Sequence, residues 1–206
     1  MRVLPCGSTA LLVELDDLDE VLAHYATLAE DAPAGVVEIV PAARTLLLVT
    51  DPAIASLSSV EQAVRSAKPR PDLGDWGEHV DIPVTYDGED LDEVAQLLGC
   101  DAVELVRRHT AADWIVAFCG FIPGFGYLTS VGWKSEVPRR STPRTKVPPG
   151  AVGLAGEFSG VYPRQSPGGW QLIGRTGLTM FDPARDPAAI LRPGVRVRFV
   201  DADGPS

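Results

Sequence analysis

The chain has 206 residues and a mass of 21.9 kDa, enough for one large domain or two small ones with a hydrophobic core. Apolar residues make up 45% and charged residues 22%, which excludes extensive disorder, collagen and coiled coil. The net charge of −10 disfavours binding to nucleic acid or to anionic membranes. Because Cys6, Cys100 and Cys119 lack metal-binding spacing, we expect reduced, buried thiols in a cytoplasmic protein.

The N-terminus and one long uncharged window bear on membrane targeting. No signal peptide is expected, because the short apolar stretch 10–13 soon meets the acidic residues Glu14, Asp16 and Asp17. Residues 114–133 are uncharged, but glycines and a proline interrupt them repeatedly. Such a segment cannot form a membrane-spanning helix, so its apolarity is expected to serve a protein core or a binding site.

The first part of the chain alternates between patterns typical of strands and of amphipathic helices. It carries 13 acidic and 5 basic residues up to position 78. The predicted elements are a strand at 10–15, a helix at 18–29, strands at 36–40 and 45–50, and a helix at 58–67. This β-α-β-β-α order predicts a small α+β domain of ferredoxin-like type, with helices on one face of an antiparallel sheet.

A Pro- and Gly-rich stretch at 68–77 has the composition of a connection between packed units. We therefore predict two domains, 1–78 and 79–206. The second begins with a predicted strand at 80–86 and two short helices at 91–98 and 102–109, followed by a strand at 114–118. Residues 120–177 then contain 12 glycines and 7 prolines, a spacing that favours a β-barrel of short strands with constrained turns.

Basic residues are concentrated between positions 134 and 175. This stretch holds seven bases against the two acids Glu136 and Glu157, within a chain whose net charge is −10. Such a cluster suits a site for a carboxylate or phosphate, although a contact with an acidic partner or a solvated face explains it equally well. The sequence contains no P-loop, dinucleotide-binding, zinc-protease or serine-hydrolase motif.

Three segments in this region are distinctive: Gly120–Leu128, Thr142–Gly153 and Tyr162–Thr176. They resemble the family of the 5-oxoprolinase B subunit, also called allophanate hydrolase subunit 1, the first half of a carboxyltransferase domain. The family includes a bacterial sporulation-kinase inhibitor. The resemblance extends from Gly7–Leu12 through Val36–Pro41 to Arg192–Phe199. It implies a small N-terminal α+β domain and an all-β, cyclophilin-like barrel as the C-terminal domain.

The same resemblance implies one part of an ATP-dependent amidohydrolase, most simply a 5-oxoprolinase that converts 5-oxo-L-proline to L-glutamate. The expected partners are a sister cyclophilin-like subunit, a third subunit of different fold and a small-molecule substrate. ATP is used by the complex, with no recognisable ATP-binding motif in this chain. The alternatives are an allophanate hydrolase or urea-carboxylase-type carboxyltransferase subunit, and a regulatory module that inhibits a histidine kinase.

Candidate site residues follow from the residue types in these segments, together with a histidine that matches the family motif. As catalytic candidates we name His109, Arg144, Lys146 and Gln171, and as substrate-binding candidates Phe125, Tyr127, Ser166, Gly168, Gly169 and Arg175. Three groups among them have a structural alternative: His109 as a histidine that satisfies the dipole at a helix C-terminus, Phe125 and Tyr127 as barrel core, and Gly168 and Gly169 as a tight turn. No metal site is expected, because acidic residues are sparse here.

Two hypotheses of different class follow. In the first, the chain is an enzyme subunit whose site is completed by the sister chain; in the second, its barrel binds a proline-containing segment of a kinase. Converging cations favour the enzyme, since peptide capture requires an apolar groove.

Overall fold

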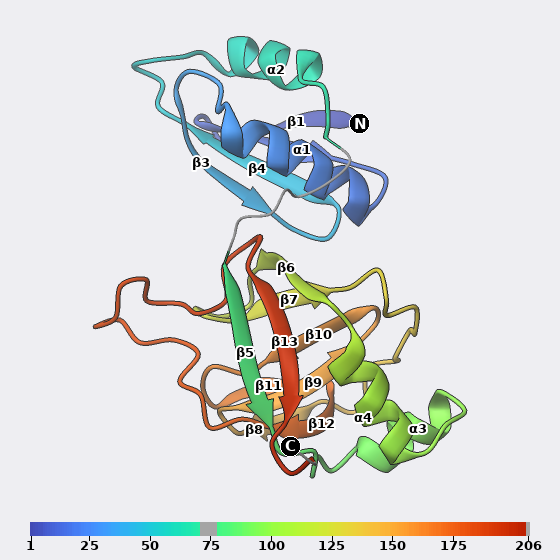
Figure 1. Ribbon diagram of the computed structural model, residues 1–206. Helices are drawn as coiled ribbons and strands as arrows, with labels where there is room; N and C mark the ends of the chain where they lie inside the picture. Colours follow the sequence, from blue (N-terminus) through green and yellow to red (C-terminus); the bar gives the residue numbers. More distant parts are fainter. Residues whose placement is uncertain (71–77, 205–206) are drawn as a thin grey trace. The chain divides into compact units, whose positions relative to one another are not determined.

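The computed structural model describes residues 1–70 and 78–204 (Figure 1). The chain divides into two compact units, Met1–Trp76 and Gly77–Ser206. Each unit buries its own apolar core, the first between positions 3 and 67 and the second between positions 80 and 199. Within the described residues, no helix combines the length and the apolarity needed to span a bilayer.

The first unit is a four-stranded antiparallel sheet with two helices (Figure 1). The strand order is β1-β2-β4-β3. The bounds are β1 Arg2–Cys6, β2 Ala10–Glu14, α1 Leu18–Glu30, β3 Val36–Pro41, β4 Thr45–Thr50 and α2 Leu57–Ser66. Alternate strand residues such as Val13 and Leu46 are buried with Val21 and Val60 of the helices, as the period-2 and period-3.6 patterns require. The predicted helices and the three predicted strands are all present.

Strand β1 was not anticipated from the sequence. It pairs antiparallel with β2 at the edge of the sheet, with Leu4 opposite Leu12. Pro5 lies within it, and proline, which lacks a backbone N–H, is compatible with an edge strand. The strand that completes the sheet therefore comes from the N-terminus, ahead of the predicted β-α-β-β-α series.

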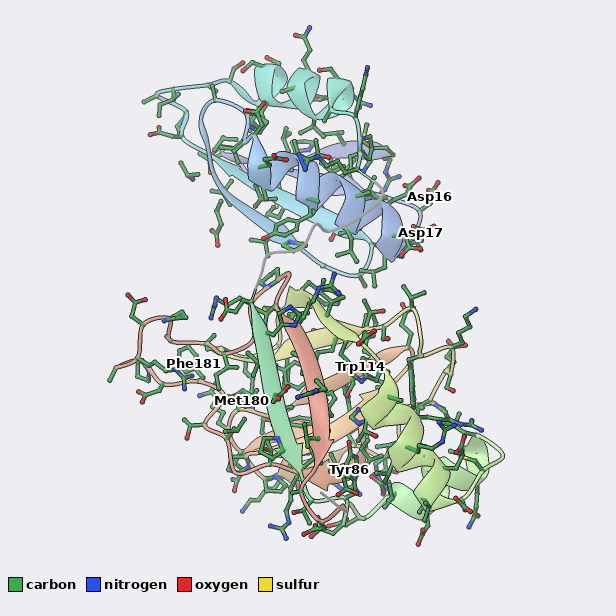
Figure 2. The ribbon with its side chains drawn as sticks, in the orientation of Figure 1. Asp16, Asp17, Tyr86, Trp114, Met180 and Phe181 are labelled. Carbon is green, nitrogen blue, oxygen red and sulfur yellow. The ribbon has the colours of Figure 1, made fainter. Side chains whose placement is uncertain are left out.

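The start of α1 is fixed by Asp17, whose side chain accepts a hydrogen bond from the backbone N–H of Glu20 at 2.9 Å (Figure 2). Near the end of the unit, the hydroxyl of Thr27 donates to the carbonyl of Lys68 and accepts from the N–H of Arg70. The first residues of the predicted connection 68–77 are thus bound to α1. The rest of that prediction, 71–77, lies outside the described residues.

The second unit is built around a seven-stranded sheet with the order β12-β9-β10-β7-β6-β13-β5. Thr85, just after β5, exchanges two backbone hydrogen bonds of 2.9 Å with Arg175 at the end of β12. The two edges of the sheet therefore meet, which closes it into a β-barrel. Strands β8 and β11 form a separate two-stranded ribbon. The strand bounds are β5 His79–Val84, β6 Trp114–Cys119, β7 Gly126–Thr129, β8 Arg144–Val147, β9 Ala151–Ala155, β10 Phe158–Val161, β11 Ser166–Gly168, β12 Gln171–Arg175 and β13 Arg196–Asp201.

Two helices belong to this unit, so it is a barrel with helices rather than purely β. They are α3, Leu91–Leu97, and α4, Ala102–Ala111, close to the two short helices predicted at these positions. Helix α4 packs against β13 (Figure 1). A long segment between β12 and β13 contains Met180 and Phe181 (Figure 2).

One part of the barrel wall is buried on both faces. On β9, Val152 and Leu154 pack in the large interior cluster, whereas Ala151 and Ala155 pack in a second, aromatic cluster. Strand β12 alternates in the same way, with Ile173 in the interior cluster and Leu172 in the aromatic one. Because successive side chains of a strand point to opposite faces, the aromatic cluster lies on the outer face of this wall.

Candidate functional site on the outer face of the barrel

Four rings form what we call the aromatic face: Phe125, Tyr127, Tyr162 and Trp170. Phe125 is central, with each of the other three ring centroids 5.2 Å away in an edge-to-face arrangement. Tyr127 and Trp170 also touch, at 5.5 Å. Edge-to-face packing fixes the rings relative to one another. Phe125, Tyr162 and Trp170 are buried, and Tyr127 is partly exposed. All three distinctive sequence segments contribute to this cluster, since Val147 of the second is buried within it.

The β8–β11 ribbon lies beside the aromatic face. Ser166 pairs with Val147 and therefore shares its face, and Gly168 pairs with Arg144. The Ser166 hydroxyl is buried and has no hydrogen-bond partner among the described residues. Gly168 lies directly against Tyr162, because a Cβ at this position would be 2.3 Å from the tyrosine oxygen. The ribbon thus brings two predicted substrate-binding residues next to the cluster.

The loop before β7 adds an exposed ring at the edge of the cluster. Phe121 has a φ of 67°, a left-handed conformation that is strained for an aromatic residue, and its side chain is 55% exposed. Its ring packs edge-on against Phe125 and Tyr162, with centroid distances of 5.6 and 6.4 Å. Backbone strain of this kind is characteristic of binding sites.

A buried carboxylate anchors two of the predicted region's arginines. The side chain of Asp90, just before α3, is 3% exposed; it accepts hydrogen bonds from Arg140 at 2.6 Å and from Arg144 at 2.8 Å. Its other oxygen accepts from the backbone N–H of Leu172 at 2.6 Å. Arg144 also reaches Glu89 at 3.0 Å. Arg144 is therefore held by acidic partners that lie more than fifty positions earlier in the chain, and it also donates to the carbonyl of Trp170 at 3.5 Å.

These contacts decide the ionisation of Asp90. Burial alone raises the pKa of this carboxyl group, but the hydrogen bonds from Arg144 and from the Leu172 N–H, with the charges of Arg144 and Arg140, outweigh it. The pKa of Asp90 therefore lies below its ordinary value. The same contacts raise the pKa of Arg144, chiefly through the hydrogen bond to Asp90.

The remaining predicted site residues are distributed more widely. Lys146 is exposed on β8, and Gly169 adjoins Trp170. Arg175 is exposed and binds Asp87 at 2.9 Å. Gln171 is buried and donates to the carbonyl of Pro138 at 3.3 Å, while its side-chain oxygen has no partner in the described part of the chain. Gln171 points to the inner side of the wall, because Leu172 beside it belongs to the outer cluster.

His109 lies in the barrel interior with no exposed surface. Its Nδ1 is 2.7 Å from the hydroxyl of Tyr86 and its Nε2 is 2.9 Å from that of Ser159. The ring stacks on Phe199 at 4.3 Å and touches Trp114, which is labelled with Tyr86 in Figure 2. Burial lowers the pKa of His109 to about 3, so the imidazole is neutral at physiological pH.

Two contributions to the site had no signal in the sequence. Asp90 is far from the Gly/Pro-rich region, and no motif links it to Arg144. Tyr162 and Trp170 lie inside the distinctive segment 162–176, but their rings could be assigned to one cluster with Phe125 only once the strand order was known. Among the described residues, no group of three or more His, Cys, Asp or Glu side chains is placed to hold a metal ion.

Comparison with known proteins gives consistent matches over nearly the whole chain. The family model described as carboxyltransferase domain, subdomain C and D, matches residues 1–191. The 5-oxoprolinase B subunit of Escherichia coli O157:H7 is 38% identical over 203 residues, covering 94% of this chain and 93% of that protein.

Solved structures agree with this result. A crystal structure of TTHA0988 is 35% identical with a TM-score of 0.77; the match covers 96% of this chain and 40% of that one. The K. lactis urea amidolyase structure shares the fold, with a TM-score of 0.72 at 18% identity, over 97% of this chain and 14% of that one. The chain belongs to the family of the carboxyltransferase domain, subdomain C and D, and within it is a relative of the 5-oxoprolinase B subunit.

Proposed function

We propose that this chain is the B subunit of an ATP-dependent 5-oxoprolinase, which converts 5-oxo-L-proline to L-glutamate with release of ADP and phosphate. The observation that carries the proposal is the 38% identity to the E. coli O157:H7 protein of that name, over 93% of that protein's length. The chemistry of the outer barrel face supports it. A cyclic amide with a carboxylate needs an apolar surface for its ring and cationic donors for its charge.

In this proposal the lactam ring lies at the edge of the aromatic face, where Tyr127 is partly exposed and Phe121 is exposed. Phe125 is buried and acts by holding Tyr127 in place, with Ser166, Gly168 and Gly169 in the adjoining ribbon and turn. The buried Ser166 hydroxyl suits this assignment, because it has no partner within the described residues. Hydrogen bonds from such preorganised donors stabilise the charge that develops on an amide oxygen when the ring opens.

Arg144, Lys146 and Arg175 are the further polar residues of the proposed site. Gln171, whose side chain lies on the inner side of the wall, acts through its hydrogen bond to the Pro138 carbonyl. Arg144 has its geometry set by Asp90, whereas Lys146 is exposed on the ribbon and can reach a ligand or a second chain. His109 acts through structure in this proposal. Its ring is fully buried and stays neutral, so it maintains the barrel interior rather than transferring a proton.

The proposed enzyme is a complex. A sister subunit with a related barrel completes the substrate site, and a third subunit of different fold contributes to the ATP-dependent reaction. ATP provides the free energy for opening the lactam. This chain contains no P-loop motif, so the nucleotide is expected to bind mainly to the partners.

Reconstitution tests the proposal. The purified chain is mixed with its sister and third subunits, and glutamate release from 5-oxoproline is measured with and without ATP. ATP-dependent glutamate formation that requires this chain is the expected result. If the complex instead hydrolyses allophanate or transfers a carboxyl group to urea, or if the chain only inhibits a histidine kinase, the assignment as 5-oxoprolinase is wrong.

A further inference from the structure

A hollow of about 420 Å³ lies in the second unit, between helix α4 and the residues at the end of β13. All of its lining residues belong to this unit. Its volume falls in the usual range of sites for small molecules. Because none of the candidate residues on the outer barrel face lines it, the hollow has no role in the function proposed above.

Helix α4 supplies an apolar wall of the hollow. Val103 and Val106 lie one helical turn apart and line it, with Thr110 one turn further on. Val103 is 79% exposed, and Val106 is partly exposed. Another side of the same helix carries the buried residues Leu105 and His109. The aliphatic surface along the hollow is therefore additional to the surface with which the helix packs in its own unit.

Tyr86 adds an aromatic side chain to the lining (Figure 2). Its hydroxyl lies 2.7 Å from Nδ1 of His109, which is fully buried, so the tyrosine is held in a fixed position. Tyr86 itself is partly exposed. Since the face of a tyrosine ring attracts a cation, this residue offers a preformed contact for a positively charged group.

Two aspartates, Asp201 and Asp203, complete the lining. Within residues 1–70 and 78–204, neither forms an ion pair with another side chain. The N–H of Asp203 donates to Oδ1 of Asp201 at 3.1 Å. The N–H of Ala202 between them donates to the carbonyl of Val84 at 2.9 Å, which ties this turn to β5. Burial raises the pKa of Tyr86 and the charge of Asp201 raises it further, so this carboxylate lies close to the tyrosine.

The arginines around the hollow already have acidic partners. Arg107 lines it and donates to Glu104 through two hydrogen bonds of 2.6 and 2.8 Å; Arg108 binds the same carboxylate at 2.7 Å. The pKa of Arg175 is raised mainly by its hydrogen bond to Asp87 and also by the charge of the second aspartate of the lining. The two aspartates of the hollow are thus the carboxylates left for an external cation.

A second hollow, of about 480 Å³, lies in the first unit and does not select a ligand charge. It is lined by Arg2 and Glu14, which pair with each other at 2.6 Å, and by Arg44 and Asp16. Charges of both signs therefore meet there, whereas the hollow beside α4 combines aliphatic, aromatic and acidic groups.

We propose that the hollow between α4 and the end of β13 binds a small organic ammonium, with its hydrocarbon body against Val103 and Val106 and its charged nitrogen between Tyr86 and the carboxylates of Asp201 and Asp203. An aromatic ring and carboxylates beside an apolar wall are the groups that recognise such a cation. 5-Oxoproline is an anion whose nitrogen is an uncharged amide, so this inference does not rest on the proposed function. A lysine side chain of another protein carries the same charged group, so the test includes it as the alternative source.

Heteronuclear NMR titration of the whole chain tests the inference, because shifted amide signals identify the site and give the affinity. The main probe is cyclohexylmethylammonium. It is compared with neutral cyclohexylmethanol, with anionic cyclohexanecarboxylate and with Nα-acetyl-lysine N-methylamide, which presents a lysine side chain. The variants are Asp201→Asn combined with Asp203→Asn, Val103→Ser and, as a matched control, Asp113→Asn at an exposed position outside the lining.

The wild-type chain is expected to bind the ammonium probe roughly five-fold more tightly than the alcohol, with shifts at the residues that line the hollow. The double Asp→Asn variant should remove this preference, because its amides keep hydrogen-bonding groups but lose the charge. Val103→Ser should weaken the ammonium and the alcohol alike, by roughly two- to three-fold, since it removes apolar contact. Asp113→Asn should change neither affinity.

Several outcomes would overturn the inference: no saturable shifts at the lining residues, equal or tighter binding of the alcohol or the carboxylate, or an equal loss in Asp113→Asn. Tighter binding of the lysine derivative than of cyclohexylmethylammonium would overturn the assignment to a small molecule. The amide spectrum of each variant shows whether it is folded. If the double variant does not fold, Val103→Ser decides alone, because its exposed position leaves the fold intact; unchanged affinities in that variant would refute the site.

Discussion

Asp90 and His109 are two buried ionisable residues, and their surroundings have opposite effects on their charge. Asp90 is surrounded by donors, and two arginines keep its carboxylate charged. His109 has only hydroxyl groups and aromatic rings around it, so burial keeps its imidazole neutral. At the residue scale, the sequence suggested a chemical role for His109 and none for Asp90. Neither environment is readable from local pattern, because the partners are brought together from distant strands and loops.

Replacement of Asp90 is expected to destabilise the second unit. Asp90→Asn leaves Arg140 and Arg144 without their buried anion, which should cost about 3 kcal/mol of unfolding free energy at pH 7. The native pKa lies below 3.8, so the carboxylate contributes stability above that pH and loses it as pH falls through the native pKa. Urea unfolding at several pH values should show that the difference in unfolding free energy between wild type and variant becomes smaller at acidic pH. Asp92→Asn, exposed in the same helix, is the control; an equal loss there would contradict the assignment.

His109 predicts a different pH dependence. The unfolded chain protonates this residue below about pH 6.5, whereas the native residue stays neutral down to about pH 3. Its contribution to stability is therefore lost as pH falls below 6.5, at up to about 1.4 kcal/mol per pH unit. His109→Phe should lower stability at pH 7, because Tyr86 and Ser159 lose their partner, and should flatten the slope between pH 6.5 and 5. The control is His79→Asn at an exposed position, which should leave the slope of unfolding free energy against pH unchanged. If His109→Phe keeps the slope, His109 is not its source.

At the scale of elements, the β8–β11 ribbon depends on one close contact between Gly168 and Tyr162. The tyrosine is buried, and its hydroxyl also receives a hydrogen bond from the backbone of Trp170. The ribbon can approach the aromatic face this closely only because residue 168 has no side chain.

Two neighbouring glycines make this contact testable. In Gly168→Ala the new methyl group would lie 2.3 Å from the Tyr162 oxygen, so the ring or the ribbon must move, at a cost of about 1–3 kcal/mol. Gly169→Ala meets nothing closer than 3.7 Å, which is ordinary contact. Thermal unfolding should show a lower midpoint for the first variant only. Equal midpoints would mean that the ribbon does not depend on this contact.

Elements with a strong local period could be predicted, and those that depend on distant pairing could not. The helix patterns at 18–29, 91–98 and 102–109 match the observed helices to within two residues. Strand β1 was missed because Pro5 interrupts its pattern. The closure of the barrel through Thr85 and Arg175 joins positions ninety residues apart, and no local signal encodes it.

The whole molecule consists of two units with separate cores, and residues of one core do not occur in the other. The second unit contains the aromatic face and all of the candidate site residues. We therefore propose that it is an independent domain, as the predicted boundary near residue 78 also implies.

Expression of Gly77–Ser206 alone tests this independence. Because both of its clusters draw only on its own residues, the fragment should unfold cooperatively, with a midpoint within about 5 °C of the corresponding transition in the whole chain. Near-ultraviolet circular dichroism checks that the aromatic packing is retained. A fragment with helical and strand signals but no near-ultraviolet signal would show that the first unit is needed for native packing.

The last prediction at this scale concerns the activity of the isolated chain and its association with partner subunits. The isolated chain should release no ADP from ATP, because it lacks a nucleotide-binding motif, and partner subunits should restore turnover. Light scattering of the chain co-expressed with its sister subunit should show a stable heteromer. Two separate monomer peaks at micromolar concentration, or ADP release by the pure chain, would contradict the shared-site model.

A single layer of β-sheet separates the barrel interior from the aromatic face. All five residues of β9 are buried, and Gly160 on β10 is so close to the rings that a Cβ there would lie 3.0 Å from Trp170. A change in the size of Leu154 or Val161 inside the barrel therefore shifts the backbone on which the rings rest. An exchange of apolar residues inside the barrel can thus reposition the rings of the proposed site without any change in the residues of the site itself.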